Sequence, residues 1–388
     1  MKKILHITTD NKFISHALST FESVYPDKNI VWMLNGVGEP NAVDDKYDES
    51  FSFLDTFRPS FIKKLKYFDL VVLHNFDVFW FSLTFLAPKG TKFAWLGWGF
   101  DYYDYIHKNP DDLLLSKTLE FKLESRKKKR KKTTLKKLVK TYIKLLLHNI
   151  IKPNALKRIG SFSPVLKEDY DLVANAKLIP HLPKFMPWNY GSLEENLIKN
   201  FIGLRVNGES ILVGNSASFT NNHIDIIDLL SKFDLAEGVN IIVPLSYGDE
   251  DYKDKITETG RLVLGTSFQP VADFMPIDEY VSLIKQCGYV VMNHKRQQAV
   301  GNIVIMLYLG ARVFLREENP TYTMLKKEGA IVNTVQELEL NPDLLKTPLT
   351  EDEIQKNIEI LYKHWSKEAI NTKTRNLVEF HLGAYSDT

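Results

Sequence analysis

The sequence predicts an α/β protein built from two doubly wound, Rossmann-like domains. Its 388 residues suit about two domains at roughly 100–200 residues each, and 44% of them are apolar, which is ample for two cores. Short apolar runs alternate with longer segments of helical spacing in two separate series along the chain. Because such alternation is typical of parallel sheets covered by helices, each series predicts one domain.

The first series spans 1–190. The predicted strands are "KKILHIT", "NIVWML", "FDLVVLH" and "KFAWLGWG", and "ISHALSTFESVY" has the spacing of a helix between the first two. A basic stretch and then "RIGSFSPV" follow. The proline-rich "NAKLIPHLPKFMP" comes next and predicts a linker or a domain edge.

The second series spans 191–350 and reads as a second doubly wound domain, followed by a helical segment at 351–388. Its predicted strands are "SILVGNS", "VNIIVPLSYG", a strand near "LVLGTSF", "GYVVMNH", "ARVFLRE" and "AIVNT". In open α/β sheets ligands bind outside the carboxyl ends of the strands. We therefore expect a cleft between the two domains that faces both sets of loops.

The composition excludes several classes of protein. A single cysteine, Cys287, excludes an internal disulfide framework and a cysteine-rich metal site. The start "MKKILHITTDNK" is too short in apolar residues for a signal peptide, and "FDVFWFSLTFLAP" is well short of the ~20 residues that span a bilayer. The chain has no HExxH, no GxSxG and no DxD at a convincing strand end, so we expect no metal and no cofactor.

The charge is strongly asymmetric. Residues 122–158 contain fifteen Lys or Arg and one acid, Glu124, so this segment is +14 and the rest of the +2 chain is −12. After seven consecutive basic residues the pattern continues as a basic amphipathic helix over 126–148, which favours an anionic membrane surface. A helix that packs its leucine face on the protein body and a nucleic-acid site remain alternatives, the latter weakened by the lack of interleaved aromatics.

The first candidate for chemistry is the loop "VGNSASFTNNH", which follows the first strand of the second domain. Gly214, Asn215 and Ser216 can bring backbone N–H groups close to an anion, and the helix that begins near His223 adds the positive end of its dipole. This pattern favours a phosphate and an ordinary strand-to-helix turn about equally. His223 can meet the anion or only begin the helix.

Two further strand ends carry polar clusters. In "NHKRQQAVGN", Arg296, Gln297 and Gln298 offer charge-assisted and amide hydrogen bonds, and Gly301 permits close backbone approach. A solvated loop is the alternative there. In "REENPTYTML", Glu318 can accept hydroxyls of a ribose or a sugar, or only interact with a helix that starts at Pro320.

The first domain holds two candidates for a general base. Asp101 lies in "WLGWGFDYYDY", where aromatic faces beside carboxylates suit a sugar and the carboxylate can take a proton from an acceptor hydroxyl. His74 ends the strand "VVLH" and is the second candidate. Aromatic runs and strand-end histidines are also common in protein cores, so a structural role remains open for both.

The second domain resembles the bacterial TDP-N-acetylfucosamine:lipid II N-acetylfucosaminyltransferases of enterobacterial common antigen synthesis, glycosyltransferase family 56. The similar pieces follow one another over 211–331: "ILVGNS…NNHI", "IIVPLSYGDEDY", "LIKQCGYVVMNHKRQQAVGN" and "ENPTYTML". The first domain shares less with the family, namely His6, His74 and "WGFDYY", which is similar to W-G-x-D-x-Y.

The resemblance implies an inverting glycosyltransferase of the GT-B type that needs no metal and is peripheral on the cytoplasmic face of the inner membrane. It implies transfer of a deoxy-acetamido sugar (Fuc4NAc-like) from a TDP-sugar donor to a polyprenyl-diphosphate saccharide acceptor. Gly214, Asn215 and Ser216 would approach the diphosphate. Arg296, Gln297 and Gln298 would bind donor phosphate or sugar, and Glu318 with Asn319 would hold the nucleoside.

The sequence also departs from the family's pattern. The basic insert is longer than the family leads one to expect, and Glu317 stands where the pattern suggests an arginine, with Arg316 adjacent. The rival functions are a nucleotide-sugar epimerase, a glycosyltransferase that uses another nucleotide sugar or a soluble acceptor, and a non-catalytic polyanion-binding protein. We expect no nucleic-acid partner.

Overall fold

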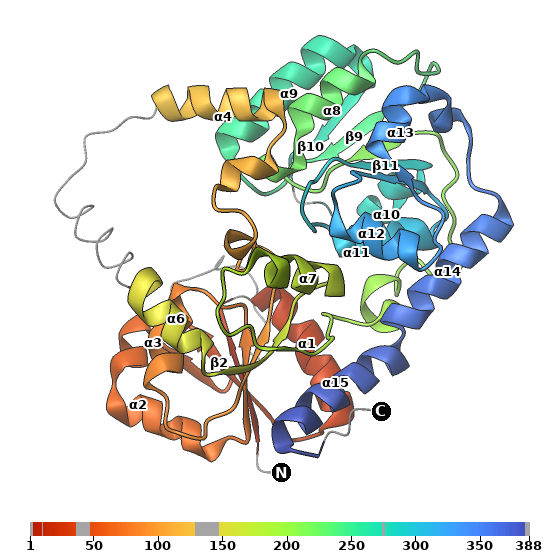
Figure 1. Ribbon diagram of the computed structural model, residues 1–388. Coiled ribbons are helices and arrows are strands. Elements are labelled where there is room, and N and C mark those ends of the chain that lie inside the picture. Colours follow the sequence, from red (N-terminus) through yellow and green to blue (C-terminus); the bar gives the residue numbers. More distant parts are fainter. Residues whose placement is uncertain are drawn as a thin grey trace. The chain divides into compact units, whose positions relative to one another are not determined.

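The structure is a computed structural model that describes residues 3–9, 11–35, 47–128, 147–273, 275 and 277–384. These residues cluster into two compact units (Figure 1). Unit 1 comprises Met1–Lys108, Lys131–Ser192 and Trp365–Thr388, and unit 2 comprises Asn109–Arg130 and Leu193–His364. Most of the predicted basic helix at 126–148 lies outside the described residues.

Unit 1 is built on a parallel sheet whose strand order is β3-β2-β1-β4-β5-β6-β7. Every residue of β1, β4 and β5 is buried, as expected for strands covered by helices on both faces. The strands are β1 (Ile4–Thr8), β2 (Asn29–Leu34), β3 (Glu49–Phe51), β4 (Leu70–His74), β5 (Phe93–Leu96), β6 (Ile159–Ser163) and β7 (Lys184–Phe185).

The helices of unit 1 include one from the far end of the chain. Helix α15 packs against α1 and β4, and its Leu377 and Val378 join Ile4, Leu70 and Val72 in one buried cluster. The main helices are α1 (Asn11–Val24), α2 (Pro59–Lys63), α3 (Val78–Leu86), α6 (Lys152–Leu156), α7 (Lys167–Ala176) and α15 (Lys367–Leu382), with a short 3-10 helix η1 (Phe53–Phe57) and a π-helix η5 (Leu147–Ile151).

Unit 2 is built on a second parallel sheet, with the order β10-β9-β8-β11-β12-β13. Renumbered from its first strand, this order is 3-2-1-4-5-6, that of a dinucleotide-binding Rossmann fold. The strands are β8 (Ile211–Val213), β9 (Ile241–Pro244), β10 (Phe268–Val271), β11 (Tyr289–Met292), β12 (Arg312–Leu315) and β13 (Asn333–Thr334). The predicted α/β class with two Rossmann-like domains is confirmed.

Polar side chains cap the starts of α9 and α12 in unit 2. Asp249 accepts a hydrogen bond from the N–H of Tyr252 at the start of α9, and Asn319 caps α12, whose first residue is Pro320. The helices are α4 (Ser116–Lys128), α8 (His223–Leu230), α9 (Glu250–Leu264), α10 (Ile277–Lys285), α11 (Val300–Tyr308), α12 (Pro320–Lys327), α13 (Val335–Leu340) and α14 (Glu351–Trp365).

Residues 109–128 belong to unit 2, although they lie in the chain between β5 and β6 of unit 1. Helix α4 packs on α8, and the carboxylate of Asp225 accepts hydrogen bonds from the N–H groups of Lys117 and Thr118 and from the Thr118 hydroxyl. A carboxylate at the start of a helix is stabilised by the free N–H groups there.

One predicted strand lies later than expected. The stretch "LVLGTSF" begins inside α9, which continues to Leu264, and β10 starts only at Phe268. Leu262 is exposed on the helix, so a short apolar run resembled a strand without being buried. Within the described ranges, no helix has both the length and the apolar character that a bilayer span requires.

Candidate active site

Three loops of unit 2 carry the residues predicted to bind the donor. They follow β8 (214–222), β11 (293–299) and β12 (316–319), which are neighbours in the sheet. The strand order reverses between β8 and β11, and ligands bind at such a switch point in open parallel sheets. The fold therefore brings the three predicted polar clusters to one edge.

Gly214 is the turning point of the first loop. Its φ is +67°, a left-handed conformation that glycine adopts without strain, and a Cβ placed there would lie 2.5 Å from Nε2 of His223. The backbone N–H of Asn215 donates to Oδ1 of Asn221 at 3.1 Å. Ser216 is buried, and its carbonyl accepts from the amide of Asn221 at 2.9 Å.

Gln298 connects the first loop to the second. Its amide donates to Oδ1 of Asn215 at 2.9 Å, and its carbonyl oxygen accepts from the Thr220 hydroxyl at 2.7 Å. The Asn215 amide in turn donates to the Tyr247 hydroxyl at 2.9 Å. Gln298 is thus held at both ends of its side-chain amide, which fixes the distance between the two loops.

A pair of buried histidines lies beneath these loops. Nε2 of His294 lies 2.6 Å from Oδ1 of Asn221, so the imidazole donates there. Burial lowers the pKa of His223 to about 3 and that of His294 well below its usual value. Nδ1 of His294 and both ring nitrogens of His223 have no hydrogen-bond partner among the described residues. Buried polar atoms of this kind are places where a water or a ligand atom completes the structure.

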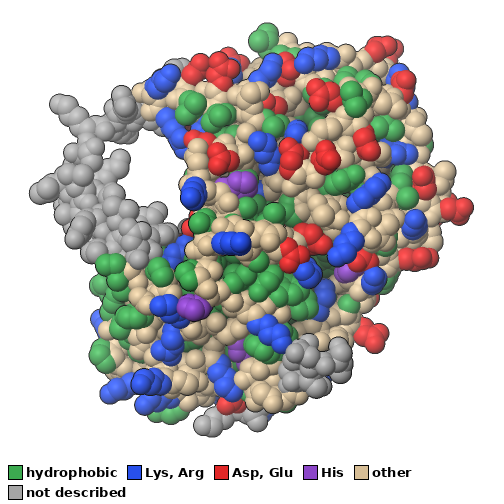
Figure 2. All heavy atoms as spheres, viewed as in Figure 1, with side chains coloured by type: hydrophobic (Ala, Val, Ile, Leu, Met, Phe, Trp, Pro, Cys, Tyr) green, Lys and Arg blue, Asp and Glu red, His purple; other side chains and the backbone are tan. Residues whose placement is uncertain are grey.

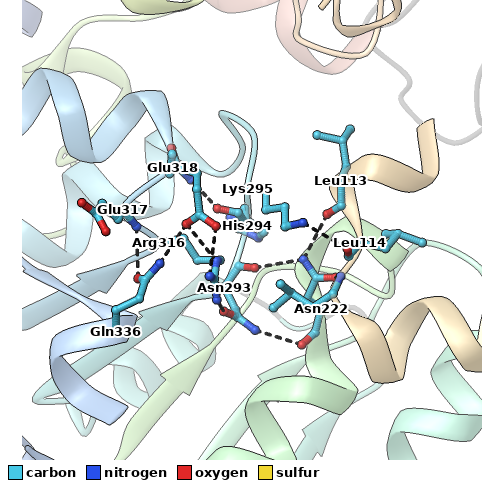
Figure 3. A network of polar contacts seen from close by, with 12 residues as sticks. Leu113, Leu114, Asn222, Asn293, His294, Lys295, Arg316, Glu317, Glu318 and Gln336 are labelled. Carbon is cyan, nitrogen blue, oxygen red and sulfur yellow. Dashed lines mark hydrogen bonds and ion pairs between the residues drawn. The ribbon is translucent and has the colours of Figure 1, made fainter. Parts of the chain in front are cut away.

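Asparagines join the second loop to its neighbours (Figure 3). The amide of Asn222 donates to the carbonyl of Asn293 and the amide of Asn293 donates back to that of Asn222, at 3.1 and 3.2 Å. Asn319 donates to the carbonyls of His294 and Arg296, both at 3.0 Å, while its oxygen caps α12. The predicted nucleoside-binding Asn319 therefore also fixes the Arg296 loop.

Glu318 forms a two-point ion pair with Arg316. The two guanidinium-to-carboxylate distances are 3.1 and 3.0 Å, and Gln336 donates to the same carboxylate at 2.9 Å (Figure 3). Burial acts to raise the pKa of Glu318, but the hydrogen bonds and charge of Arg316 bring it below the usual value. The carboxylate is ionised at neutral pH. Glu317 is exposed, and its backbone N–H donates to Oε1 of Gln336 at 3.2 Å.

The other predicted donor residues lie in the β11–α11 loop and the first turn of α11. The Arg296 guanidinium is partly exposed and donates to the carbonyl of Gln297 at 3.2 Å, and Gln297 is buried. A Cβ on Gly301 would meet only Leu197, at an ordinary 3.6 Å. Packing therefore does not explain a glycine at position 301.

Asp101 and His74 lie in unit 1, at the carboxyl edge of its sheet. The Asp101 carboxylate accepts from the N–H groups of Phe76 and Trp98 and from the indole of Trp95, at 2.9, 2.8 and 2.6 Å. Burial raises the pKa of Asp101, although these hydrogen bonds act to lower it. Asp101 thus organises the loops after β4 and β5, and its role as a base stays a prediction.

Several residues that complete these sites carried no signal on their own. Asn221, Asn222 and Asn293 were parts of quoted motifs. A single sequence does not distinguish an asparagine whose side chain joins two loops by hydrogen bonds from an ordinary turn residue. His294 lies two positions before Arg296 but had no predicted role. The described residues contain no group of three or more His, Cys, Asp or Glu side chains placed to hold a metal ion.

Solved glycosyltransferases share this fold across nearly the whole chain. Anabaena HepE in complex with UDP and glucose has a TM-score of 0.60 at 14% identity, with 97% of this chain and 98% of that chain covered. The lipopolysaccharide outer core galactosyltransferase WaaB gives 0.59 at 12%, covering 97% and 99%. Sucrose-phosphate synthase from Thermosynechococcus elongatus gives 0.63 at 9%, covering 99% and 100%.

The shared fold and a family match over 193–356 together indicate a glycosyltransferase with the GT-B fold. Residues 193–356 match the family described as 4-alpha-L-fucosyltransferase, glycosyl transferase group 56. This match supports the predicted resemblance over this part of the chain, which contains all three loops predicted to bind the donor.

Proposed function

We propose that this glycosyltransferase moves a deoxy-acetamido sugar (Fuc4NAc-like) from a TDP-sugar to a polyprenyl-diphosphate saccharide, with inversion and without a metal. The observation that supports the donor half is the meeting of the predicted loops at the switch point of unit 2. The family match over 193–356 supports the sugar class.

In this proposal the donor diphosphate lies over Gly214 and Asn215. The positive ends of α8 and α11 and the Arg296 guanidinium stabilise the negative charge that the diphosphate gains as the sugar leaves. Glu318, held by Arg316, accepts hydroxyls of the ribose. Because the loops are cross-linked by side chains before the donor arrives, little reorganisation remains for the moment of reaction.

Thermal stabilisation of the full chain by TDP, UDP, GDP and ADP tests the donor assignment. A ligand at 100 times its dissociation constant adds about 2.7 kcal/mol, which is readily measured. We expect a shift with TDP that Arg296→Ala abolishes. A shift with UDP alone would keep the transferase and discard the TDP donor, and no shift with any nucleotide would contradict the proposed site.

We propose further that unit 1 docks on an anionic membrane that carries the polyprenyl-linked acceptor. In this proposal that membrane surface is the cytoplasmic face of the inner membrane. Exposed apolar side chains gather on α3 and on η1 and η5, both of which contact α3 (Figure 2): Leu54, Phe57, Phe85, Leu86 and Ile150. The chain enters η5 from 129–146, a stretch with eight Lys or Arg and no acid. Apolar surface beside such charge suits an anionic lipid interface.

Flotation with phosphatidylglycerol-containing vesicles tests the docking surface. We expect the double variant Leu54→Glu/Phe57→Glu to lose most of its vesicle binding. The matched control is Leu262→Glu, which places the same charge on an exposed leucine of unit 2. Equal binding by the double variant and the wild type would refute this surface.

A further inference from the structure

A continuous chain of hydrogen bonds crosses unit 1 beneath the carboxyl edge of its sheet. Tyr190 Oη lies 2.7 Å from Nδ1 of His74, Nε2 of His74 lies 3.0 Å from Nδ1 of His6, and Nε2 of His6 lies 3.1 Å from Oδ1 of Asn29. Both histidines are completely buried, while Tyr190 and Asn29 are partly exposed. This chain of hydrogen bonds therefore links two parts of the surface of unit 1 through its core.

The direction of every hydrogen bond in this chain follows from its far end. The amide nitrogen of Asn29 donates to the Glu22 carboxylate at 2.8 Å and to the carbonyl of Tyr25 at 2.9 Å, so its oxygen faces His6. Nε2 of His6 must then carry the proton. Burial lowers the pKa of His6 to about 4 and that of His74 well below its usual value, so both rings are neutral at pH 7.

Neutral imidazoles have one donor and one acceptor each. Since Nε2 of His6 donates, its Nδ1 accepts from Nε2 of His74, and Nδ1 of His74 in turn accepts from the Tyr190 hydroxyl. The phenolic proton of Tyr190 is thus committed to His74. A hydroxyl that approaches the phenol oxygen meets an acceptor.

The place of Tyr190 in unit 1 matches that of the donor loops in unit 2. His74 ends β4, which neighbours β1 at the point where the strand order of this sheet reverses. The ring of Trp98 lies edge-on to Tyr190 with centroids 5.8 Å apart, and the exposed Phe100 lies next to Trp98. Aromatic faces beside a hydroxyl acceptor suit a saccharide.

We infer that Tyr190 is the catalytic residue that receives the proton of the acceptor hydroxyl, with His74 and His6 behind it as the proton-accepting pair. This inference rests on the proposed transferase function. It differs from a base role for Asp101, whose carboxylate already accepts three hydrogen bonds from the protein.

The step balances in atoms and charge. The acceptor oxygen forms its bond to the anomeric carbon while the bond from that carbon to the diphosphate breaks, and the electron pair leaves with the diphosphate. The acceptor's proton passes to the Tyr190 oxygen as the phenolic proton passes to Nδ1 of His74. Tyr190 ends neutral. Because burial disfavours a charged imidazole, the pair takes up this proton only transiently and passes it to solvent.

The experiment measures TDP release by the full chain with a TDP-sugar and a polyprenyl-diphosphate disaccharide. We expect Tyr190→Phe to lower kcat about 100-fold, the scale of general base catalysis, and to leave the KM for the TDP-sugar within twofold. Tyr170→Phe is the matched control, because it also removes a hydrogen-bonded phenol from unit 1, one that donates to the Pro183 carbonyl. It should keep the wild-type kcat.

A double-mutant cycle separates catalysis from folding. If Tyr190 and His74 act as one unit, His74→Gln and Tyr190→Phe together should cost no more in kcat than the larger single loss. Additive losses, or a Tyr190→Phe enzyme within threefold of wild-type kcat, would overturn the inference and leave the transferase in place. A wild-type chain that turns over no hydroxyl acceptor would overturn the proposed function, and the inference with it.

Discussion

Replacing Asn221 with alanine should weaken both the fold of unit 2 and its nucleotide site. Its oxygen accepts from the Asn215 N–H and from His294, and its amide donates to the Ser216 carbonyl. The substitution leaves two groups, the buried His294 ring nitrogen and the partly buried Asn215 N–H, without these partners, while the Ser216 carbonyl keeps its hydrogen bond from the Ser218 N–H. At about 1–3 kcal/mol for each buried unsatisfied group, the loss is centred near 3–4 kcal/mol.

Thermal unfolding and TDP binding are the two measurements. For a unit of this size, about 2–4 °C is lost per kcal/mol, so the transition of unit 2 should fall by roughly 6–16 °C. We also expect the Kd for TDP to rise at least about tenfold, because the N–H of Asn215 loses the acceptor that orients its loop. Tenfold corresponds to about 1.4 kcal/mol.

Asn357→Ala is the control for stability alone. Asn357 is also a buried asparagine of unit 2, but its amide hydrogen bonds join α14 to Ile331, in another part of the unit. This variant should lower the transition while the Kd for TDP stays unchanged. The reasoning is refuted if Asn221→Ala melts within 2 °C of the wild type, or if it is destabilised and still binds TDP normally.

Three further predictions concern single positions. Gly214→Ala should abolish TDP binding, because a side chain at φ of +67° costs about 1–2 kcal/mol and the new Cβ would clash with His223. The control is Gly203→Ala, at φ of +75° with open space around it, which should bind TDP normally in the same titration. Burial lowers the pKa of Lys373 from 10.5 to about 8, so the unfolded state binds more protons and stability should rise between pH 8 and 10. Urea unfolding of Lys373→Met should show a smaller rise than the wild type. Burial raises the pKa of Cys287 to about 12, so a thiol reagent should label it only after unfolding, and rapid labelling of the native chain would contradict its burial.

The strands and most helices of both sheets could be predicted from the sequence because their apolar runs are short, fully buried and separated by clear turn residues. β8, β11 and β12 each end in the polar cluster that the sequence singled out. The strand at "LVLGTSF" was misplaced because Leu262 and Val263 are apolar yet exposed on α9. Periodicity over seven residues does not separate these cases.

The assignment of 109–128 to unit 2 could not be predicted. What holds α4 there is the contact of Asp225 and Asn222 with backbone N–H groups of residues 115–118, more than 100 positions away. The local amino-acid composition does not predict a contact between residues so far apart in the sequence. The same holds for Tyr190 and His74, which are 116 residues apart and share one hydrogen bond.

The packing of α15 determines the order in which the two units can complete their folding during synthesis. A ribosome releases the chain from its N-terminus, and domains generally fold as they emerge. The face of β4 that α15 covers, and the cluster that Leu377 and Val378 complete, can form only after residues 367–382 have been synthesised. Unit 2, whose last residue is His364, is complete earlier. The loops predicted to bind the donor can therefore fold while β4, the strand that carries His74, still lacks the cover of α15.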